Sequence, residues 1–179
     1  MKNRKTKITG FTLIELMVTI SIAAILLAIG VPSFQAIIEN NRLATQSNEL
    51  ITAVNLARSE AIKRSCDITI DPGANGYVQG WTVSTDTTSG PGRSPCPAAE
   101  TVRVFDGFNG LKIRDEDDTN TVFATSITFN SRGQKFPLAG TETRILLQPE
   151  NCATGSIDRA RAIRISNTGR ASVVRRDCA

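Results

Sequence analysis

The chain opens with an apolar stretch that is long enough to cross a membrane. From Phe11 to Val31 it is apolar apart from Thr12, Glu15, Thr19 and Ser21. A helix of this length is about 30 Å long at ~1.5 Å per residue, which matches the hydrocarbon thickness of a bilayer. We therefore expect residues 11–31 to form a transmembrane helix.

A helical period continues beyond residue 31, but the apolar positions narrow to one face. The expected stripe consists of Leu43, Ser47, Leu50, Val54, Ala57 and Ala61, widened by Ile51 and Ile62. Polar residues cover much of the remaining surface, as in an amphipathic helix that lies on a domain. We expect one helix of more than fifty residues that ends near Arg64 or Ser65, with 32–65 as its amphipathic half. Pro32 removes a helical hydrogen bond and predicts a kink.

Residues 66–179 change to short β-branched segments separated by Gly, Pro, Asn and Asp, which indicates a β-rich globular domain. No strand alternates with a helix, so the sheet should be antiparallel and the fold class α+β. We expect a loop over Thr87–Ala98 and turns at Asp71-Pro72-Gly73 and Asn75-Gly76. The expected strands are Asp67–Ile70, Gly80–Thr85, Thr101–Phe105, Ser126–Asn130, Arg144–Gln148, Ala162–Ser166 and Ala171–Arg175.

The net charge of +4 belongs to the first ten residues, which contain four basic and no acidic residues. Without Lys2, Arg4, Lys5 and Lys7 the chain has 17 basic and 17 acidic residues. Basic residues before an apolar helix favour a cytoplasmic N-terminus and an exported remainder. A secretory signal peptide would need a small-residue cleavage site after the apolar stretch, and Gly30-Val31-Pro32 is a poor one.

Glu15 distinguishes this segment from a plain single-pass anchor. A carboxylate at the centre of a membrane helix costs about 2.5–3.5 kcal/mol on insertion scales, so it usually has a partner. A cut between Gly10 and Phe11 would create an α-amino group four residues before Glu15. That ammonium could pair with the carboxylate, within one chain or between neighbours.

The segment Lys7–Leu16, with the sequence KITGFTLIEL, resembles the class III signal of type IV pilins and type II secretion pseudopilins. The resemblance implies that residues 1–10 are a leader peptide and that a prepilin peptidase cuts after Gly10 and N-methylates Phe11. It also implies that Glu15 aids assembly by meeting the N-terminus of a neighbouring subunit. Pro32 falls where members of this family often carry a kinking proline.

Three segments of the body, Gly80–Asp86, Ile127–Gly133 and Ile163–Arg170, resemble the branch of that family that contains the GspH pseudopilin and the FimT and FimU minor pilins. The resemblance implies a pilin-like fold, in which the long N-terminal helix packs on a C-terminal antiparallel β-sheet domain. Trp81 and Phe129 in these segments are expected in the core.

The four cysteines, Cys66, Cys96, Cys152 and Cys178, form no C-x-x-C pair, so zinc or thioredoxin-like chemistry is not expected. An even number after an export segment favours two disulfides in an oxidising compartment. Three pairings are open. We favour Cys66–Cys96 with Cys152–Cys178, because each closes a moderate loop that would contribute roughly 3 kcal/mol.

The C-terminal region is rich in arginine, which forms forked contacts with phosphate. FimT-like relatives bind DNA through a C-terminal Gly-Arg-x-Arg motif, whereas here Gly169-Arg170-Ala171 is followed by Ser172. The candidate DNA-binding residues are Arg170, Arg175 and Arg176, with a solvated edge strand as the competing interpretation.

Enzymatic activity is not expected, because the chain has no histidine and no nucleophile or phosphate-binding motif. Neither a cofactor nor a metal is expected. The acidic run Asp115-Glu116-Asp117-Asp118 lacks the EF-hand glycine and glutamate, so we interpret it as a solvated loop.

The family resemblance implies a FimU-like minor pilin that helps initiate assembly at the tip of a type IV pilus and supports adhesion and twitching. Its partners would be prepilin peptidase, other minor pilins and the major pilin. It would start in the bacterial inner membrane with its domain in the periplasm, and end in a pilus or pseudopilus. The alternatives are a FimT-like DNA-binding minor pilin and a GspH-like secretion pseudopilin.

Overall fold

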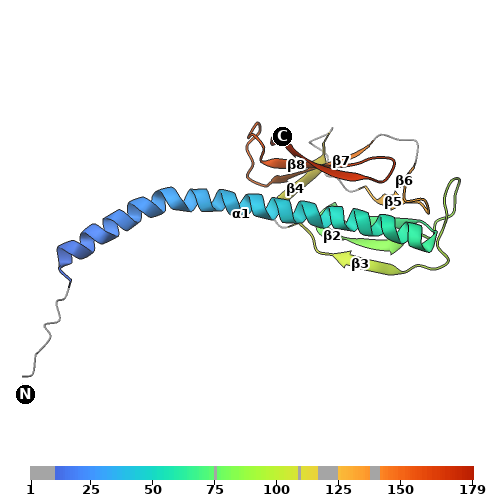
Figure 1. The fold of residues 1–179 in the computed structure, drawn as a ribbon, viewed down its shortest axis with the longest axis horizontal. Helices are drawn as coiled ribbons and strands as arrows, with labels where there is room; N and C mark the ends of the chain where they lie inside the picture. Colours follow the sequence, from blue (N-terminus) through green and yellow to red (C-terminus); the bar gives the residue numbers. More distant parts are fainter. Residues whose placement is uncertain (1–10, 75, 109, 117–124, 138–141) are drawn as a thin grey trace, which may run out of the picture. The chain divides into compact units, whose positions relative to one another are not determined.

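The computed structural model describes residues 11–74, 76–108, 110–116, 125–137 and 142–179. The chain divides into two compact units, Met1–Glu39 and Asn40–Ala179 (Figure 1). The basic N-terminal residues, Gly10, Asn75, Asp117 and Asp118 lie outside the described residues, so the predictions that concern them remain predictions.

The long helix predicted from the apolar and amphipathic patterns is present as α1, Leu13–Arg64, with 52 residues. Its end at Arg64 agrees with the predicted boundary. Lys63 and Arg64 occupy the last turn, where cations interact favourably with the negative end of the helix dipole. Ser65 follows in the left-handed conformation, with φ of 55°, which stops the helical path.

The globular unit contains two antiparallel sheets, whereas the sequence predicted one. The five-stranded sheet has the order β3-β2-β1-β5-β6. Its strands are β1 Ile68–Gly73, β2 Gly76–Thr85, β3 Thr101–Phe105, β5 Ile127–Phe129 and β6 Lys135–Phe136. The predicted turn at Asp71-Pro72-Gly73 was wrong, because Asp71 and Pro72 pair with Thr82 and Trp81 inside the β1–β2 ladder.

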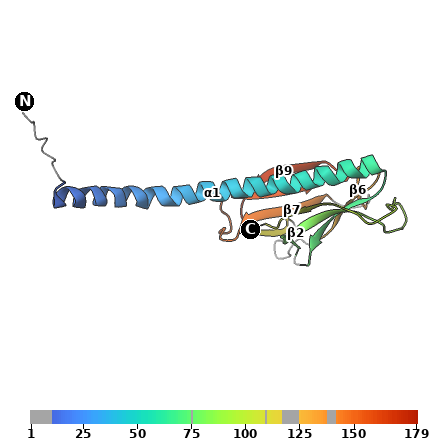
Figure 2. The same ribbon diagram turned by 90° about the horizontal axis from the view of Figure 1, so that it is seen from below.

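The four-stranded sheet has the order β4-β7-β8-β9, and its strands β7 and β9 are labelled in Figure 2. Its strands are β4 Leu111–Asp115, β7 Thr143–Pro149, β8 Ala160–Ile165 and β9 Ala171–Arg176. The sequence did not predict β4 or the two-residue β6. In β4 the apolar residues Leu111 and Ile113 alternate with charged ones over only five residues, which is too short for a firm periodicity.

The amphipathic half of α1 supplies one wall of the core. All six residues of the predicted stripe are at most 1% exposed, and Ala53 joins them. Ser47 is accommodated because its hydroxyl donates a 2.6 Å hydrogen bond to the carbonyl oxygen of Leu43. Ile51 is partly buried, but Ile62 is 50% exposed, so its assignment to the stripe was wrong.

Aromatic side chains fill the core beneath β2, as predicted for Trp81 and Phe129. Trp81 is 2% exposed and stacks on Phe105 with ring centroids 5.4 Å apart. The ring centroids of Phe108 and Tyr77 lie 4.7 and 5.8 Å from that of the same indole. This cluster stabilises the β2–β3 edge of the five-stranded sheet, since aromatic pairs contribute about 0.5–1.5 kcal/mol beyond their buried area.

Candidate assembly and binding sites

The N-terminal unit exposes an apolar surface within the single chain. Side chains from Phe11, 84% exposed, to Ile38, 56% exposed, contribute to it. None of the most apolar stretch of α1 is buried. Length and composition therefore make α1 a candidate membrane span. Pro32 lies inside the bounds of α1, and its predicted kink stays a prediction.

Thr12 and Glu15 form a helix cap at the start of α1. The backbone N–H of Glu15 donates a 3.3 Å hydrogen bond to the Thr12 hydroxyl, and Glu15 is the acidic residue of the first turn. A Thr at the cap and a Glu three positions later are typical of a capping box, in which the acid also favours the positive helix end. This role of Thr12 was not predicted, although the T-x-x-E pattern before an apolar stretch is its sequence signal.

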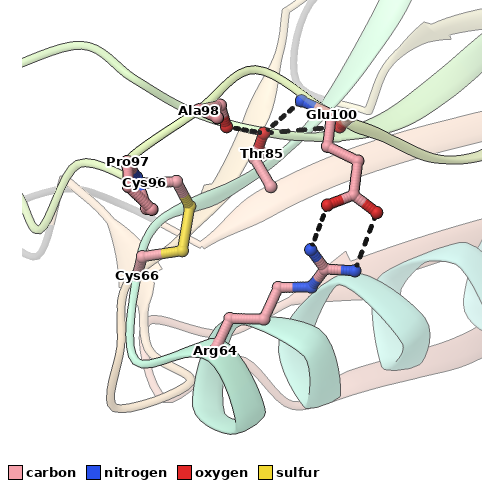
Figure 3. A pocket seen from close by; sticks show the side chains of 7 residues that line it. All are labelled: Arg64, Cys66, Thr85, Cys96, Pro97, Ala98 and Glu100. Carbon is pink, nitrogen blue, oxygen red and sulfur yellow. Dashed lines mark hydrogen bonds and ion pairs between the residues drawn. A yellow bond between two sulfur atoms is a disulfide. The ribbon is translucent and has the colours of Figure 1, made fainter.

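A disulfide links the segment just after the C-terminal end of α1 to the loop before β3. The structure contains the Cys66–Cys96 disulfide, with Cα atoms 5.0 Å apart, and the Cys152–Cys178 disulfide, at 6.0 Å. These are the two pairs that the sequence favoured. The first lines a pocket of about 280 Å³ together with the side chains shown in Figure 3.

Within this pocket, polar contacts hold the loop to the helix. Arg64 donates hydrogen bonds of 2.6 and 3.3 Å to the two carboxylate oxygens of Glu100. These bonds lower the pKa of Glu100. Thr85 donates to the carbonyl oxygen of Ala98 at 2.8 Å and accepts from the Glu100 N–H at 2.6 Å. The polar groups that line the pocket thus bind one another. This favours a structural role, in which they hold the loop before β3 to α1, over a ligand-binding role.

A buried acid next to the disulfide anchors the same loop. Asp67 is fully buried, and burial raises the pKa of its carboxyl group. Its Oδ2 accepts a 3.1 Å hydrogen bond from the Ser94 N–H and lies 3.5 Å from Arg93 Nε. Arg93 also pairs with Asp86. The positive charge of Arg93 therefore compensates the negative charges of Asp67 and Asp86. As a result the loop stays folded against β1 although it has no regular structure.

The three arginines predicted as candidate DNA-binding residues do not form one basic surface. On the four-stranded sheet, Glu116 accepts hydrogen bonds of 3.0 and 2.7 Å from Arg164 and of 2.8 Å from Arg176. The pKa of Glu116 is lowered mainly by the bond with Arg164. Arg176 thus forms an ion pair with an acid of its own chain, and the sequence did not predict this pair. Asp115 and Glu116 belong to the acidic run that was interpreted as a solvated loop. That interpretation was wrong for both, because Asp115 is the last residue of β4 and Glu116 pairs with two arginines.

The other two candidate residues lie at opposite ends of β9. Arg170 is exposed at the β8–β9 turn, where its N–H donates to the Ser166 hydroxyl. Arg175 is exposed near the far end and lies opposite Arg161. Arg161 has a lowered pKa through burial first and the nearby Arg175 charge second. Arg175 lies five positions after Arg170, so the extended backbone keeps them about 17 Å apart at ~3.3 Å per residue.

These features define a class of protein with an exposed apolar N-terminal helix and a disulfide-bonded, β-rich globular head. No cluster of three or more potential metal ligands occurs among the described residues. The model of the type II transport protein GspH family matches residues 46–169, and that of the prokaryotic N-terminal methylation motif matches residues 5–31. The chain belongs to the GspH family of type IV pilin-like proteins, whose members are structural subunits of pili and pseudopili.

Individual relatives agree with this assignment. The chain is 30% identical over 122 residues to the type IV major fimbrial protein FimA of Dichelobacter nodosus, covering 65% of this chain and 69% of that protein. A crystal structure of the type IV minor pilin FimU of Pseudomonas aeruginosa matches with 25% identity and a TM-score of 0.53. It covers 76% of this chain and 90% of the FimU chain. A second crystal form of FimU matches with a TM-score of 0.52, 24% identity and coverage of 74% and 92%. The predicted α+β pilin-like fold is confirmed.

Proposed function

We propose that this protein is a FimU-like minor pilin of a type IV pilus that helps to initiate assembly at the pilus tip, and so supports adhesion and twitching. The observation that carries the proposal is the match of fold and sequence to FimU over 90% of the FimU chain. The match of residues 5–31 to the methylation motif supports processing at the N-terminus.

The proposed mechanism is packing of helices. Before assembly the 11–31 segment lies in the inner membrane, with the disulfide-bonded head in the periplasm. Prepilin peptidase cuts after Gly10 and methylates Phe11. The exposed apolar side chains of the first unit then leave lipid and pack against equivalent helices of other minor pilins and the major pilin. Related subunits that contact one another head to tail form an open filament.

Glu15 sets how far one helix is shifted along its neighbour in this packing. An ionised carboxylate in an apolar bundle is strongly destabilising unless a cation neutralises it. The α-amino group at Phe11 of a neighbouring subunit is such a cation, and it exists only after the leader has been removed. Processing thereby becomes a condition for assembly.

The first test is the N-terminus of the mature protein. Cells that express prepilin peptidase should yield a chain that begins with N-methylated Phe11, as measured by mass spectrometry. Gly10→Val should leave the precursor uncut. Gly30→Val is the matched control, because it makes the same change in an open position of α1 and should be processed normally. A mature terminus at any other residue would contradict the proposal.

The second test identifies the filament. Deletion of the gene should reduce surface pili and twitching while type II secretion continues, and the wild-type gene should restore them. The GspH-like alternative predicts the reverse, with lost secretion and normal piliation. The FimT-like alternative predicts normal pili with impaired DNA uptake. The exposed Arg170 and Arg175 keep the DNA-binding alternative open to test.

A further inference from the structure

The β3 strand leaves a free edge next to a groove in the globular unit. It is the outermost strand of its sheet and pairs with β2 alone among the described residues (Figure 1). Val104 in this strand is 66% exposed. An edge strand presents unpaired backbone N–H and C=O groups, so it is a template for another strand.

The groove beside this edge carries acids that lack an ion-pair partner. It has a volume of about 350 Å³, and its lining consists of Glu49 and Thr52 from α1 with Arg103, Val104, Phe105 and Asp106 from the β3 region. Arg103 lies over the Phe105 ring at 4.7 Å. Neither Glu49 nor Asp106 forms a salt bridge within the described part of the chain, so both carboxylates can accept a cation from outside.

The β9 strand is a complementary edge on the other sheet. It is the outermost strand of its sheet and pairs with β8. Val173 and Val174 are 41% and 37% exposed, and Arg175 follows without a salt bridge among the described residues. β9 is therefore an extended, exposed segment with valines to contact Val104 and an arginine to meet an acid.

We propose that β9 of a second copy of this chain adds to the free edge of β3 by main-chain hydrogen bonds, with its Arg175 directed to the acidic groove at Glu49 and Asp106. Backbone pairing of this kind gives affinity, and the side chains beside it give specificity. The two surfaces differ, so the contact is head to tail and can be repeated from copy to copy. It goes beyond the proposed function, because it does not depend on which filament the protein joins.

Photo-crosslinking of the full chain in detergent micelles tests the contact. The photoreactive amino acid p-benzoylphenylalanine replaces Val104 in β3. Illumination should give a covalent dimer whose cross-linked peptide, identified by mass spectrometry, comes from residues 170–177. The same probe at exposed Asn55 on α1 is the control and should not label that peptide. No dimer, or a dimer linked through other segments only, would overturn the proposal.

A charge swap tests the role of the groove. Arg175→Glu and Glu49→Arg should each lower the yield of the dimer by about two- to fivefold, which is the range of an exposed ion pair. The double variant should recover most of the yield, because the pair is restored with reversed sign. Arg132→Glu removes the same charge from another exposed site and should have little effect. Loss of yield in the double variant as severe as in the single ones would exclude the proposed pairing.

Discussion

Arg58 donates a 3.1 Å hydrogen bond from Nε to the carbonyl oxygen of Gly133, across 75 residues of sequence. The bond joins α1 to the turn between β5 and β6. Gly169, at the β8–β9 turn, packs against the same carbonyl oxygen and against the Arg58 side chain. Three segments that are remote in sequence therefore meet at one backbone group, and both sheets are fixed there to the helix.

We expect Gly169→Ala to destabilise the head by about 2–4 kcal/mol, because strain and overlap add. Gly169 has φ of 78°, and a Cβ atom there would overlap the Gly133 carbonyl oxygen. Gly155→Ala separates the two causes, because its φ is 81° but nothing lies within 4 Å. That control should cost only about 1 kcal/mol. Urea unfolding followed by circular dichroism measures both, and equal losses would show that contact with Gly133 is unimportant.

Glu116→Gln should destabilise the head by about 1–2 kcal/mol at pH 7, because Arg164 and Arg176 lose a charged acceptor. The folded pKa of Glu116 is lowered below its ordinary value of 4.5. Its contribution is therefore fully present above pH 4.5 and disappears as the pH falls through the folded pKa. Unfolding curves of wild type and variant should differ at pH 7 and converge as the pH is lowered through that folded pKa. Glu150→Gln, at an exposed acid, should follow wild type throughout.

Glu15→Ala should still insert in the membrane and be processed, but pili should be reduced severalfold on immunoblots of sheared surface filaments. The reason is the loss of the proposed pair with a neighbouring α-amino group. Glu15→Gln distinguishes this role from helix capping, since Gln also suits a capping box but carries no charge. If Gln assembles normally while Ala does not, capping rather than charge is the function of Glu15.

For a minor pilin without DNA-binding activity we expect no gel shift with duplex DNA, even at low salt, where phosphate contacts are strongest. A shift that disappears on raising the salt, and in the double variant Arg170→Ala with Arg175→Ala, would favour the FimT-like alternative. The double variant Arg132→Ala with Lys112→Ala is the matched control, because it removes two exposed charges elsewhere. Equal losses in both would indicate non-specific attraction.

The sequence alone determined the features that local patterns encode. The 52-residue helix, its buried stripe and its end at Arg64 follow from helical periodicity. Seven strands were recognised from β-branched runs, and the leader motif indicated the family. Such signals depend on neighbours within a few residues along the chain.

Only the tertiary structure decided what depends on distant pairing. Asp71-Pro72-Gly73 has the residues of a turn, yet pairing with β2 holds Asp71 and Pro72 in a strand. Glu116 reads as one acid of a solvated run until the chain brings Arg164 and Arg176 to it, 48 and 60 residues later. The same contacts distinguish Arg164 and Arg176, which bond to Glu116, from Arg170 and Arg175, which are exposed. No local pattern records these contacts, because their energy depends on which strands become neighbours.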